Sequence, residues 1–275
     1  MATPLSEEDA SRYALYVKTV QGGALRGLFE TMCHVIHDTN LVWEPAVPGV
    51  DGSGGLKLLT MDGARCALVF LKLDAVNFDT FHCPAQLVTG LNMSSVWKLL
   101  KTASSHDCIV LHVERNNSHE LGITIHNADK NALTEYKLKL LDCDAEIIQV
   151  PDVTFDRILT LPSAYFQRLC REMTHLGDHM AVAITGNNLK LSCDGSFASQ
   201  STIIGEADSC MAIESSSGED VEGTFSLRYL NLFTRASTLC ATVQLFLKQN
   251  YPLILSYSVA SLGSLKFCLA SRVDE

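Results

Sequence analysis

The sequence contains no pair of cysteines in a CxxC spacing, although 10 of its 275 residues are cysteine. Such pairs are the usual unit of structural zinc sites and of thiol–disulfide active sites, and disulfide scaffolds are typical of short secreted chains. Their absence from a chain of this length favours a reducing compartment. Most of the cysteines are then expected to be buried as small apolar side chains.

The sequence also has no apolar run that approaches the roughly 20 residues of a membrane-spanning helix. Its start, MATPLSEED, is acidic and lacks an apolar core, so we expect no signal peptide. We expect residues 1–12 to form a flexible polar extension. Apolar residues make up 47% of the chain, which is typical of a folded globular protein rather than a disordered one.

Motifs of catalysis are missing as well. No Lys-Ser or Lys-Thr follows the segment Gly52–Gly55, so it does not match a phosphate-binding loop, and there is no nucleophile elbow. The pairs His34, His37 and His175, His179 have no further ligand at a spacing that completes a metal site. The sequence therefore predicts a binding or scaffolding protein without catalytic residues, metal or cofactor. A metal- or thiol-dependent enzyme is the alternative from another class.

One helical pattern occurs twice. Val96, Leu99, Leu100 and Ala103 have the i, i+3, i+4, i+7 spacing of an amphipathic helix, which predicts a helix over 94–103. Asn92 or Ser94 can cap its start. The pattern returns 134 residues later and predicts a second helix over 226–237.

The rest of the chain shows the same duplication. Earlier helices are expected at 23–36 and 163–175, and each half continues with alternating strand patterns. Two helices and antiparallel strands in each half predict an α+β class with an internal repeat. We expect an N-terminal domain over 13–139, an acidic, proline-closed connector over 140–156 and a C-terminal domain over 157–275.

Charge is unevenly distributed along this acidic chain, whose net charge is −10. The four expected helices carry seven cations against two carboxylates. The cations are Arg26, Lys98, Lys101, Arg168, Arg171, Arg228 and Arg235. A surface that binds a polyanion would have this pattern, and so would ordinary solvated helix faces; charge alone does not separate the two.

Several short segments, in their order and spacing, resemble one family. They are Val20–Gly22, Met61–Asp62, Phe78–Thr80, Tyr136–Asp144, Arg168–Asp178 and Leu227–Asn231. The family is the eukaryotic DNA sliding clamp, proliferating cell nuclear antigen, and the resemblance runs from about Tyr13 to Arg272. It implies the DNA clamp fold, with two equivalent domains that each pack two helices on antiparallel sheet. Three such subunits close head to tail into a ring.

The resemblance places the seven helical cations on the wall of the ring's central channel. There they would neutralise phosphates of double-stranded DNA without reading its sequence. Gly27 and Cys33 stand where the family usually has lysines, which implies a weaker hold on DNA.

The resemblance also implies a groove that binds partner peptides beside the connector. Such peptides carry a glutamine, then an aliphatic residue and paired aromatic residues. The matching positions are Met61, Arg65, Cys66, Leu68, Ile148, Val150, Pro151, Phe155, Pro252, Leu269 and Ala270. Most are apolar, as aromatic anchors require, although core packing explains each of them equally well one at a time. Arg65, Cys66 and Cys268 depart from the family pattern and imply a shifted peptide preference.

Ring closure in the family pairs an edge strand of one subunit with an edge strand of the next. The matching segments are about Leu133–Leu141 and Phe197–Ile204. The expected interface residues are Tyr136, Leu138, Leu140, Phe197 and Ile203. Exposed edges of this kind aggregate unless they are paired, which a closed ring achieves.

The function implied by the resemblance is that of a homotrimeric processivity factor and not of an enzyme. It would encircle duplex DNA, tether a polymerase, and recruit a ligase or nuclease for replication and repair, after a separate ATP-driven loader opens it. The expected location is the nucleus, or a cytoplasmic replication site for a viral member. The alternative is a subunit of a heterotrimeric checkpoint clamp, or a monomeric processivity factor.

Overall fold

The computed structural model describes residues 6–50, 52–143, 148, 153–206, 211–215 and 220–272. These residues divide into two compact units. Unit 1 comprises 6–60, 70–143 and Val259–Ser264, and unit 2 comprises Met61–Val69, most of the C-terminal half up to Ser258, and 265–272. The sequence-based domain bounds 13–139, 140–156 and 157–275 stay a prediction.

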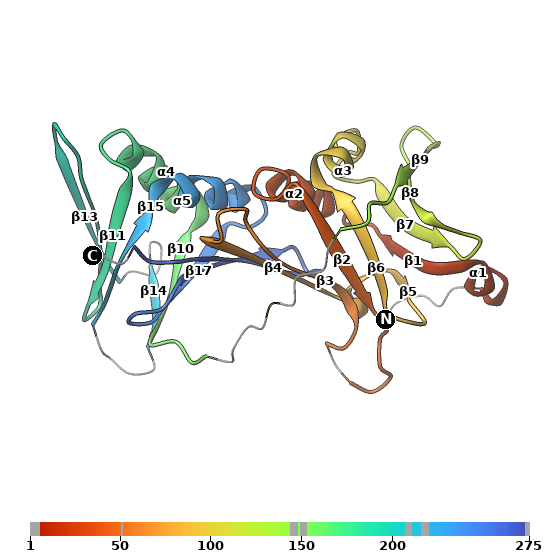
Figure 1. Ribbon diagram of the computed structural model, residues 1–275, viewed down its shortest axis with the longest axis horizontal. Coiled ribbons are helices and arrows are strands. Elements are labelled where there is room, and N and C mark those ends of the chain that lie inside the picture. Colours follow the sequence, from red (N-terminus) through yellow and green to blue (C-terminus); the bar gives the residue numbers. More distant parts are fainter. Residues whose placement is uncertain are drawn as a thin grey trace. The chain divides into compact units, whose positions relative to one another are not determined.

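The N-terminal half of the chain contains three α-helices and nine strands within its described residues (Figure 1). In chain order these are α1 (Glu7–Arg12), β1 (Tyr13–Thr19), α2 (Gly22–Met32), β2 (Asp38–Glu44), β3 (Gly55–Met61), β4 (Ala67–Asp74), the 3₁₀ turn η1 (Ala75–Asn77), β5 (Thr80–His82), β6 (Leu87–Asn92), α3 (Met93–Leu100), β7 (Cys108–Glu114), β8 (Asn117–Asn127) and β9 (Ala132–Lys139).

The C-terminal half repeats this sequence of elements without a counterpart of α1. Its elements are β10 (Arg157–Pro162), α4 (Ser163–Thr174), β11 (His179–Thr185), β12 (Asn188–Asp194), β13 (Ser199–Gly205), β14 (Ala212–Ser215), β15 (Val221–Ser226), α5 (Leu227–Phe233), the 3₁₀ turn η2 (Thr234–Thr238), β16 (Thr242–Leu247), β17 (Leu253–Val259) and β18 (Gly263–Leu269).

The two halves have the same strand order. In the first, strands run β5-β1-β7-β8-β9 in one group and β4-β3-β2-β6 in another. In the second, the matching orders are β14-β10-β16-β17-β18 and β13-β12-β11-β15. The predicted duplication and the α+β class are therefore confirmed, with α4 starting 141 positions after α2 and α5 starting 134 positions after α3.

Each long helix forms because its apolar residues recur on one face and meet the strands of its own unit. In α4 the buried stripe is Phe166, Leu169, Cys170 and Met173, while the intervening positions are exposed except for the half-buried Gln167. In α3 the Asn92 side chain accepts a hydrogen bond of 2.9 Å from the Ser95 amide, which caps the helix as predicted.

Several predicted bounds were wrong, because local hydrogen bonds rather than periodicity end a helix. The helix expected over 23–36 ends at Met32, and the one expected over 94–103 ends at Leu100. The helix expected over 226–237 becomes a 3₁₀ turn after Phe233. Residues 7–12, expected to be part of a flexible extension, form α1, whose start is capped by Ser6.

The strands β1, β6, β10 and β15 were not predicted. Each of these strands precedes a helix with at most two residues between them. The spacing of apolar residues therefore changes from period 2 to period 3.6 within a few residues, which hides the strand pattern. A long loop joins β2 to β3. It is held by Ser53, whose hydroxyl accepts a hydrogen bond from the Val47 amide (2.9 Å) and donates to the Val50 carbonyl (2.7 Å).

Both units have a dense apolar core. In unit 1 the fully buried Trp43 donates its indole N–H to Thr89 at 2.9 Å, so this large side chain has no unpaired polar atom. In unit 2 the rings of Phe233 and Phe267 stack with centroids 4.5 Å apart, and Tyr257 meets Phe267 edge-on. These cores fix the helices on which the predicted cations stand.

Candidate functional site

Unit 1 brings its three predicted DNA-binding cations to the α2–α3 helix pair, whose members contact each other. Lys98 on α3 and Lys101 at its end are exposed. Arg26 on α2 is half-buried, and its guanidinium donates a 2.7 Å hydrogen bond to the Ala103 carbonyl. Arg26 therefore also ties α2 to the turn that follows α3.

Unit 2 carries the other four predicted cations on the equivalent pair, α4 and α5. Arg168, Arg171 and Arg228 stand exposed on the helices and Arg235 on η2. Arg168 lies over the ring of Tyr165 at 5.2 Å and 3.6 Å from the Glu172 carboxylate, one helical turn away. Such an exposed pair contributes little to stability, so Arg168 can exchange Glu172 for another anion.

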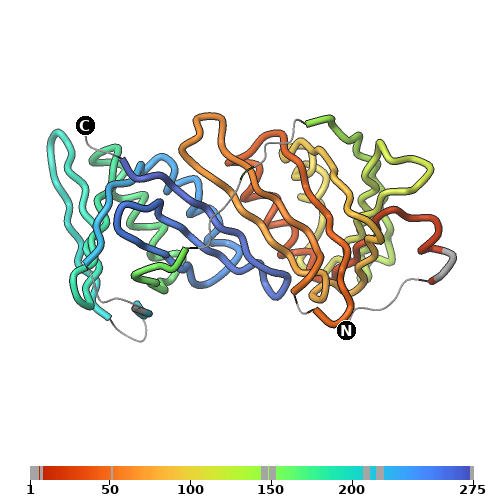
Figure 2. The backbone as a smooth tube through the Cα atoms, turned by 60° about the horizontal axis from the view of Figure 1, so that its bottom comes forward, coloured from red at the N-terminus to blue at the C-terminus, as the bar shows by residue number. Residues whose placement is uncertain are grey.

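The two segments predicted to close a ring are terminal strands of their sheets. β9 pairs with β8 alone among the described strands, and β13 pairs with β12 alone (Figure 2, teal hairpin). Phe197, in the turn before β13, is 75% exposed, and Ile203 is 67% exposed. Tyr136, Leu138 and Leu140 are half-buried.

Tyr136 lies on the side of β9 that faces the helices. It is in register with the buried Ile123 of β8, and its hydroxyl is 3.4 Å from the Thr102 hydroxyl after α3. Alternate residues of β9, Leu133 and Glu135 among them, point to the opposite face.

The predicted groove positions that the structure describes divide into three groups by their exposure. Met61, Arg65, Cys66 and Ala270 are exposed, and Leu68, Ile148, Phe155 and Pro252 are half-buried. Leu269 is 1% exposed and thus belongs to the core of unit 2. Val150 and Pro151 lie outside the described residues.

Within unit 2 the structure joins several of these positions. The Ala270 amide donates to the Cys66 carbonyl at 3.1 Å, which links the turn after β3 to the residue after β18. Phe155 lies edge-on to Phe246 and Tyr251, with ring centroids 5.3 and 5.9 Å away, beside Pro252. Phe246 and Tyr251 were not among the predicted groove positions. The alternation of Phe246 with buried residues along β16 is the signal that could have found it; Tyr251, in the turn after β16, has no such signal.

Asp62 forms the centre of the turn between β3 and β4. Its Oδ1 accepts hydrogen bonds from the amides of Cys66 and Ala67, both at 2.8 Å, and its Oδ2 accepts one from the Ala64 amide at 3.3 Å. The hydroxyl of Tyr229, on α5, donates to the same Oδ2 at 2.5 Å. No pattern in the sequence indicates this contact.

The electrostatics of the pair follow from these bonds. Burial alone would raise the pKa of Asp62, but the hydrogen bonds from Tyr229 and the turn amides outweigh burial and lower it. The hydrogen bond to Asp62, helped by burial, raises the pKa of Tyr229 to about 12. Asp62 is thus charged and Tyr229 protonated throughout the neutral range.

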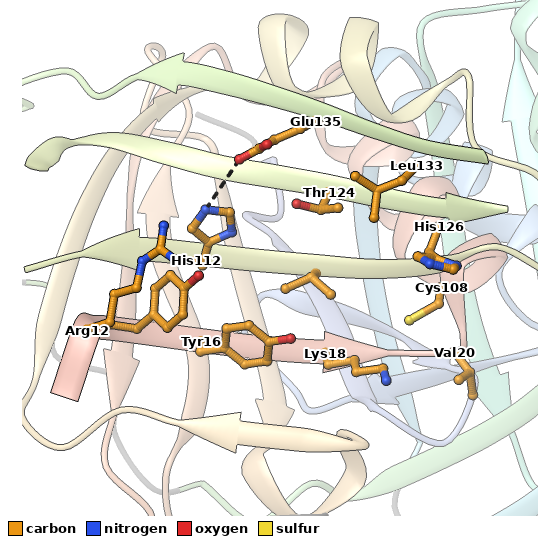
Figure 3. A pocket seen from close by; sticks show the side chains of 12 residues that line it. Arg12, Tyr16, Lys18, Val20, Cys108, His112, Thr124, His126, Leu133 and Glu135 are labelled. Atoms are coloured by element: carbon orange, nitrogen blue, oxygen red, sulfur yellow. Dashed lines mark ion pairs between the residues drawn. The ribbon is translucent and has the colours of Figure 1, made fainter. Parts of the chain in front are cut away.

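A shallow pocket of about 540 Å³ lies on the outer face of the β1-β7-β8-β9 sheet, the face opposite to the buried Leu15 and Ile123. Figure 3 shows Tyr16 and Lys18 on β1, His112 on β7 and Glu135 on β9 pointing into it. Its side chains mix both charges with aromatic rings. Cys108 on β7 lies in register with His126 on β8, and burial raises the pKa of the Cys108 thiol.

Metal ligands do not gather anywhere in the described part of the chain: no group of three or more His, Cys, Asp or Glu side chains could hold an ion. Among the same residues, no helix has the length and apolar character to cross a bilayer. The candidates for the site are the exposed cations on the helices, the terminal strands β9 and β13, and the turn anchored by Asp62.

Comparisons with known proteins identify the family. Residues 15–147 match the family model "Proliferating cell nuclear antigen, N-terminal domain", and residues 149–272 match "Proliferating cell nuclear antigen, C-terminal domain". The chain is 37% identical over 266 residues to the "Probable DNA polymerase sliding clamp 1" of Paramecium bursaria Chlorella virus 1. That alignment covers 95% of this chain and 98% of the viral protein.

Proposed function

The chain belongs to the proliferating cell nuclear antigen family, and from this premise we propose that it is a DNA sliding clamp that closes as a homotrimer around duplex DNA. Members of this family are not enzymes, so the protein's activity is binding. It holds a DNA polymerase on its template because a closed ring cannot dissociate sideways from the duplex.

One observation supports the proposal most strongly. A chain with net charge −10 presents cations on the helix pair of each unit, at Lys98 and Lys101 in unit 1 and at Arg168, Arg171, Arg228 and Arg235 in unit 2. Many weak contacts with phosphates hold a duplex without reading its bases, and they allow movement along it. The acidic remainder repels DNA from other surfaces.

Partner proteins would dock through the groove positions of unit 2. Met61, Arg65, Cys66 and Ala270 are exposed there, and Phe155 is half-buried. A polymerase, a clamp loader, and a ligase or nuclease would each bring a short peptide with a glutamine, an aliphatic and two aromatic residues. The protein would act at the site of DNA replication.

Charge reversal tests the DNA-binding surface. We expect Lys98→Glu, Lys101→Glu and Arg235→Glu together to weaken binding to a closed circular duplex and to abolish stimulation of the polymerase. The plot of log affinity against log salt should become shallower by up to about 9, because each phosphate contact contributes about 1 and three cations change in each of three subunits.

The matched control reverses three cations that stand away from the helices, Lys57, Arg115 and Lys190. Net charge changes equally in both variants, so the control should keep wild-type DNA retention if position rather than total charge decides. Equal retention by wild type and the helix variant would contradict the assignment of the helices to DNA.

A further inference from the structure

The turn between β3 and β4 adopts a conformation that its own sequence does not favour. Arg65 has a φ of +57°, in the left-handed region that residues with a side chain seldom occupy, and no glycine stands at that position. The side chains of Arg65 and Cys66 are exposed, so core packing does not hold the turn in place. Hydrogen bonds must therefore fix it.

Asp62 provides these bonds, as described above. The two carboxylate oxygens of Asp62 accept hydrogen bonds from three backbone amides, those of Ala64, Cys66 and Ala67. In addition, the Arg65 amide donates to the backbone carbonyl of Asp62 at 2.9 Å. The carboxylate can do this only while its own orientation is fixed. The fourth donor, the hydroxyl of Tyr229 at 2.5 Å, is the one that comes from outside the turn.

Tyr229 is rigidly placed by the core of unit 2. It lies on α5, its ring centroid is 6.1 Å from that of Phe233, and Phe233 stacks on Phe267 of β18 at 4.5 Å. A chain of packed rings thus leads from the core to the Tyr229 hydroxyl and from there to Asp62. At its far end the turn is joined to Ala270 through the Cys66 carbonyl.

We infer that the Asp62–Tyr229 pair positions one wall of the partner-peptide groove, an inference that rests on the groove of the proposed function. The pair sets where Arg65 and Cys66 stand relative to Ala270, and these are the exposed positions that a docking peptide meets. Because Arg228 on the same helix is a proposed DNA contact, α5 serves both surfaces.

Removal of the Tyr229 hydroxyl tests the inference. In Tyr229→Phe the ring still packs against Phe233, but the carboxylate of Asp62 loses its outside donor. We expect amide hydrogen exchange over 62–67 to accelerate. A fluorescent synthetic peptide with a glutamine, an aliphatic and two aromatic residues should bind about tenfold more weakly, because the docking conformation of the turn is then populated only about a tenth of the time.

Two further variants separate positioning from general damage. Tyr165→Phe removes a tyrosine hydroxyl from α4 of the same unit, where the side chain is also half-buried, and should change neither exchange nor peptide affinity. Asp62→Asn keeps the shape of the side chain but weakens its hydrogen bonds. The double variant with Tyr229→Phe should lose less peptide-binding free energy than the sum of the losses in the two single variants, since both changes affect the same hydrogen bond.

The outcomes are distinguishable. Faster exchange over 62–67 together with weaker peptide binding supports the inference. If wild type and Tyr229→Phe bind the peptide equally, the inference is wrong and the groove stands. If the wild-type protein itself does not bind the peptide, the proposed groove is wrong, and the inference is overturned with it.

Discussion

Among single residues, His112 is buried by its neighbours on the outer face of the β1-β7-β8-β9 sheet of unit 1. It is 9% exposed, and the ring of Tyr13 meets it edge-on with centroids 5.2 Å apart. Gly122 lies opposite on β8, where a Cβ atom would be 2.2 Å from the imidazole. A side chain at position 122 would therefore expel His112 from the sheet surface.

The protonation of His112 is decided mainly by burial. Burial lowers the pKa of His112, and this outweighs the opposite effect of Glu135 and Glu114; Arg12 and Lys137 lower it further. The imidazole is consequently neutral at pH 7. Its 4.0 Å approach to Glu135 is then a contact between a neutral ring and a carboxylate rather than an ion pair (Figure 3).

This predicts how stability depends on pH. Below the ordinary histidine pKa of about 6.5, the unfolded chain binds a proton at His112 that the folded chain resists, so the free energy of unfolding falls as the pH is lowered. The slope from this one site is at most about 1.4 kcal/mol per pH unit. Urea unfolding between pH 7 and pH 5 should show a shallower fall for His112→Gln than for wild type.

The matched control is His126→Gln, which removes an exposed histidine from the same face of the sheet. We expect it to keep the wild-type pH dependence. Parallel curves for wild type and His112→Gln would show that burial does not keep His112 neutral.

At the scale of secondary-structure elements, α3 and α5 are copies that begin differently. Asn92 caps α3 by accepting from the Ser95 amide, and its own amide group donates to Asp38 at 2.7 Å. Ser226 stands at the equivalent position of α5, where no side-chain hydrogen bond caps the helix. The duplicated helix thus offers its own internal comparison.

We expect Asn92→Ala to lower the free energy of unfolding by about 0.5–2 kcal/mol, the usual cost of losing a cap. Ser226→Ala should cost less than about 0.5 kcal/mol, since no cap is lost. Urea unfolding monitored by circular dichroism measures both. Equal losses in the two variants would mean that the Asn92 hydrogen bond adds nothing to α3.

The same comparison shows what sequence can and cannot predict. Buried stripes such as Phe166, Leu169 and Met173 predict a helix because burial follows a period of 3.6 residues. Strand β6 was missed because its last residue, Asn92, is also the cap of α3. Helix ends were misplaced because single hydrogen bonds determine them.

The candidate site also contains features that the sequence can predict and features that it cannot. Exposed cations such as Lys98 and Arg228 could be predicted, since charge on an amphipathic helix lies opposite its apolar stripe. The Asp62–Tyr229 hydrogen bond could not, because 167 positions separate the two residues and only the fold brings them together. No local pattern encodes such a contact.

At the scale of the whole molecule, two of the terminal strands, β9 and β13, are the candidates for pairing with another chain. Among the described strands, β9 and β13 each have a neighbour on one side only. Leu133 on β9 is 61% exposed, Ile203 on β13 is 67% exposed, and Phe197 in the turn before β13 is 75% exposed. Edges of this kind aggregate if left open. In the proposed ring, β9 of one subunit pairs with β13 of the next, a head-to-tail contact that closes after three copies.

Native mass in solution tests this assembly. Light scattering on a sizing column should give three times the 30.1 kDa chain mass, stable on dilution to low micromolar concentration. Tyr136→Ala and Ile203→Lys should each shift the mass toward one chain, because the first removes the ring on the helix side of β9 and the second places a charge on β13. Val76→Lys, at an exposed residue outside both strands, should leave the trimer intact.

The wild-type result discriminates between the assemblies. A single-chain mass at every concentration would mean that β9 and β13 do not pair with copies of themselves. The fold and the channel cations would then belong to a monomeric processivity factor or to one subunit of a heterotrimeric clamp. A trimer that survives Tyr136→Ala and Ile203→Lys would instead place the subunit contact on other residues, because two independent changes on the paired edges would have left it unaffected.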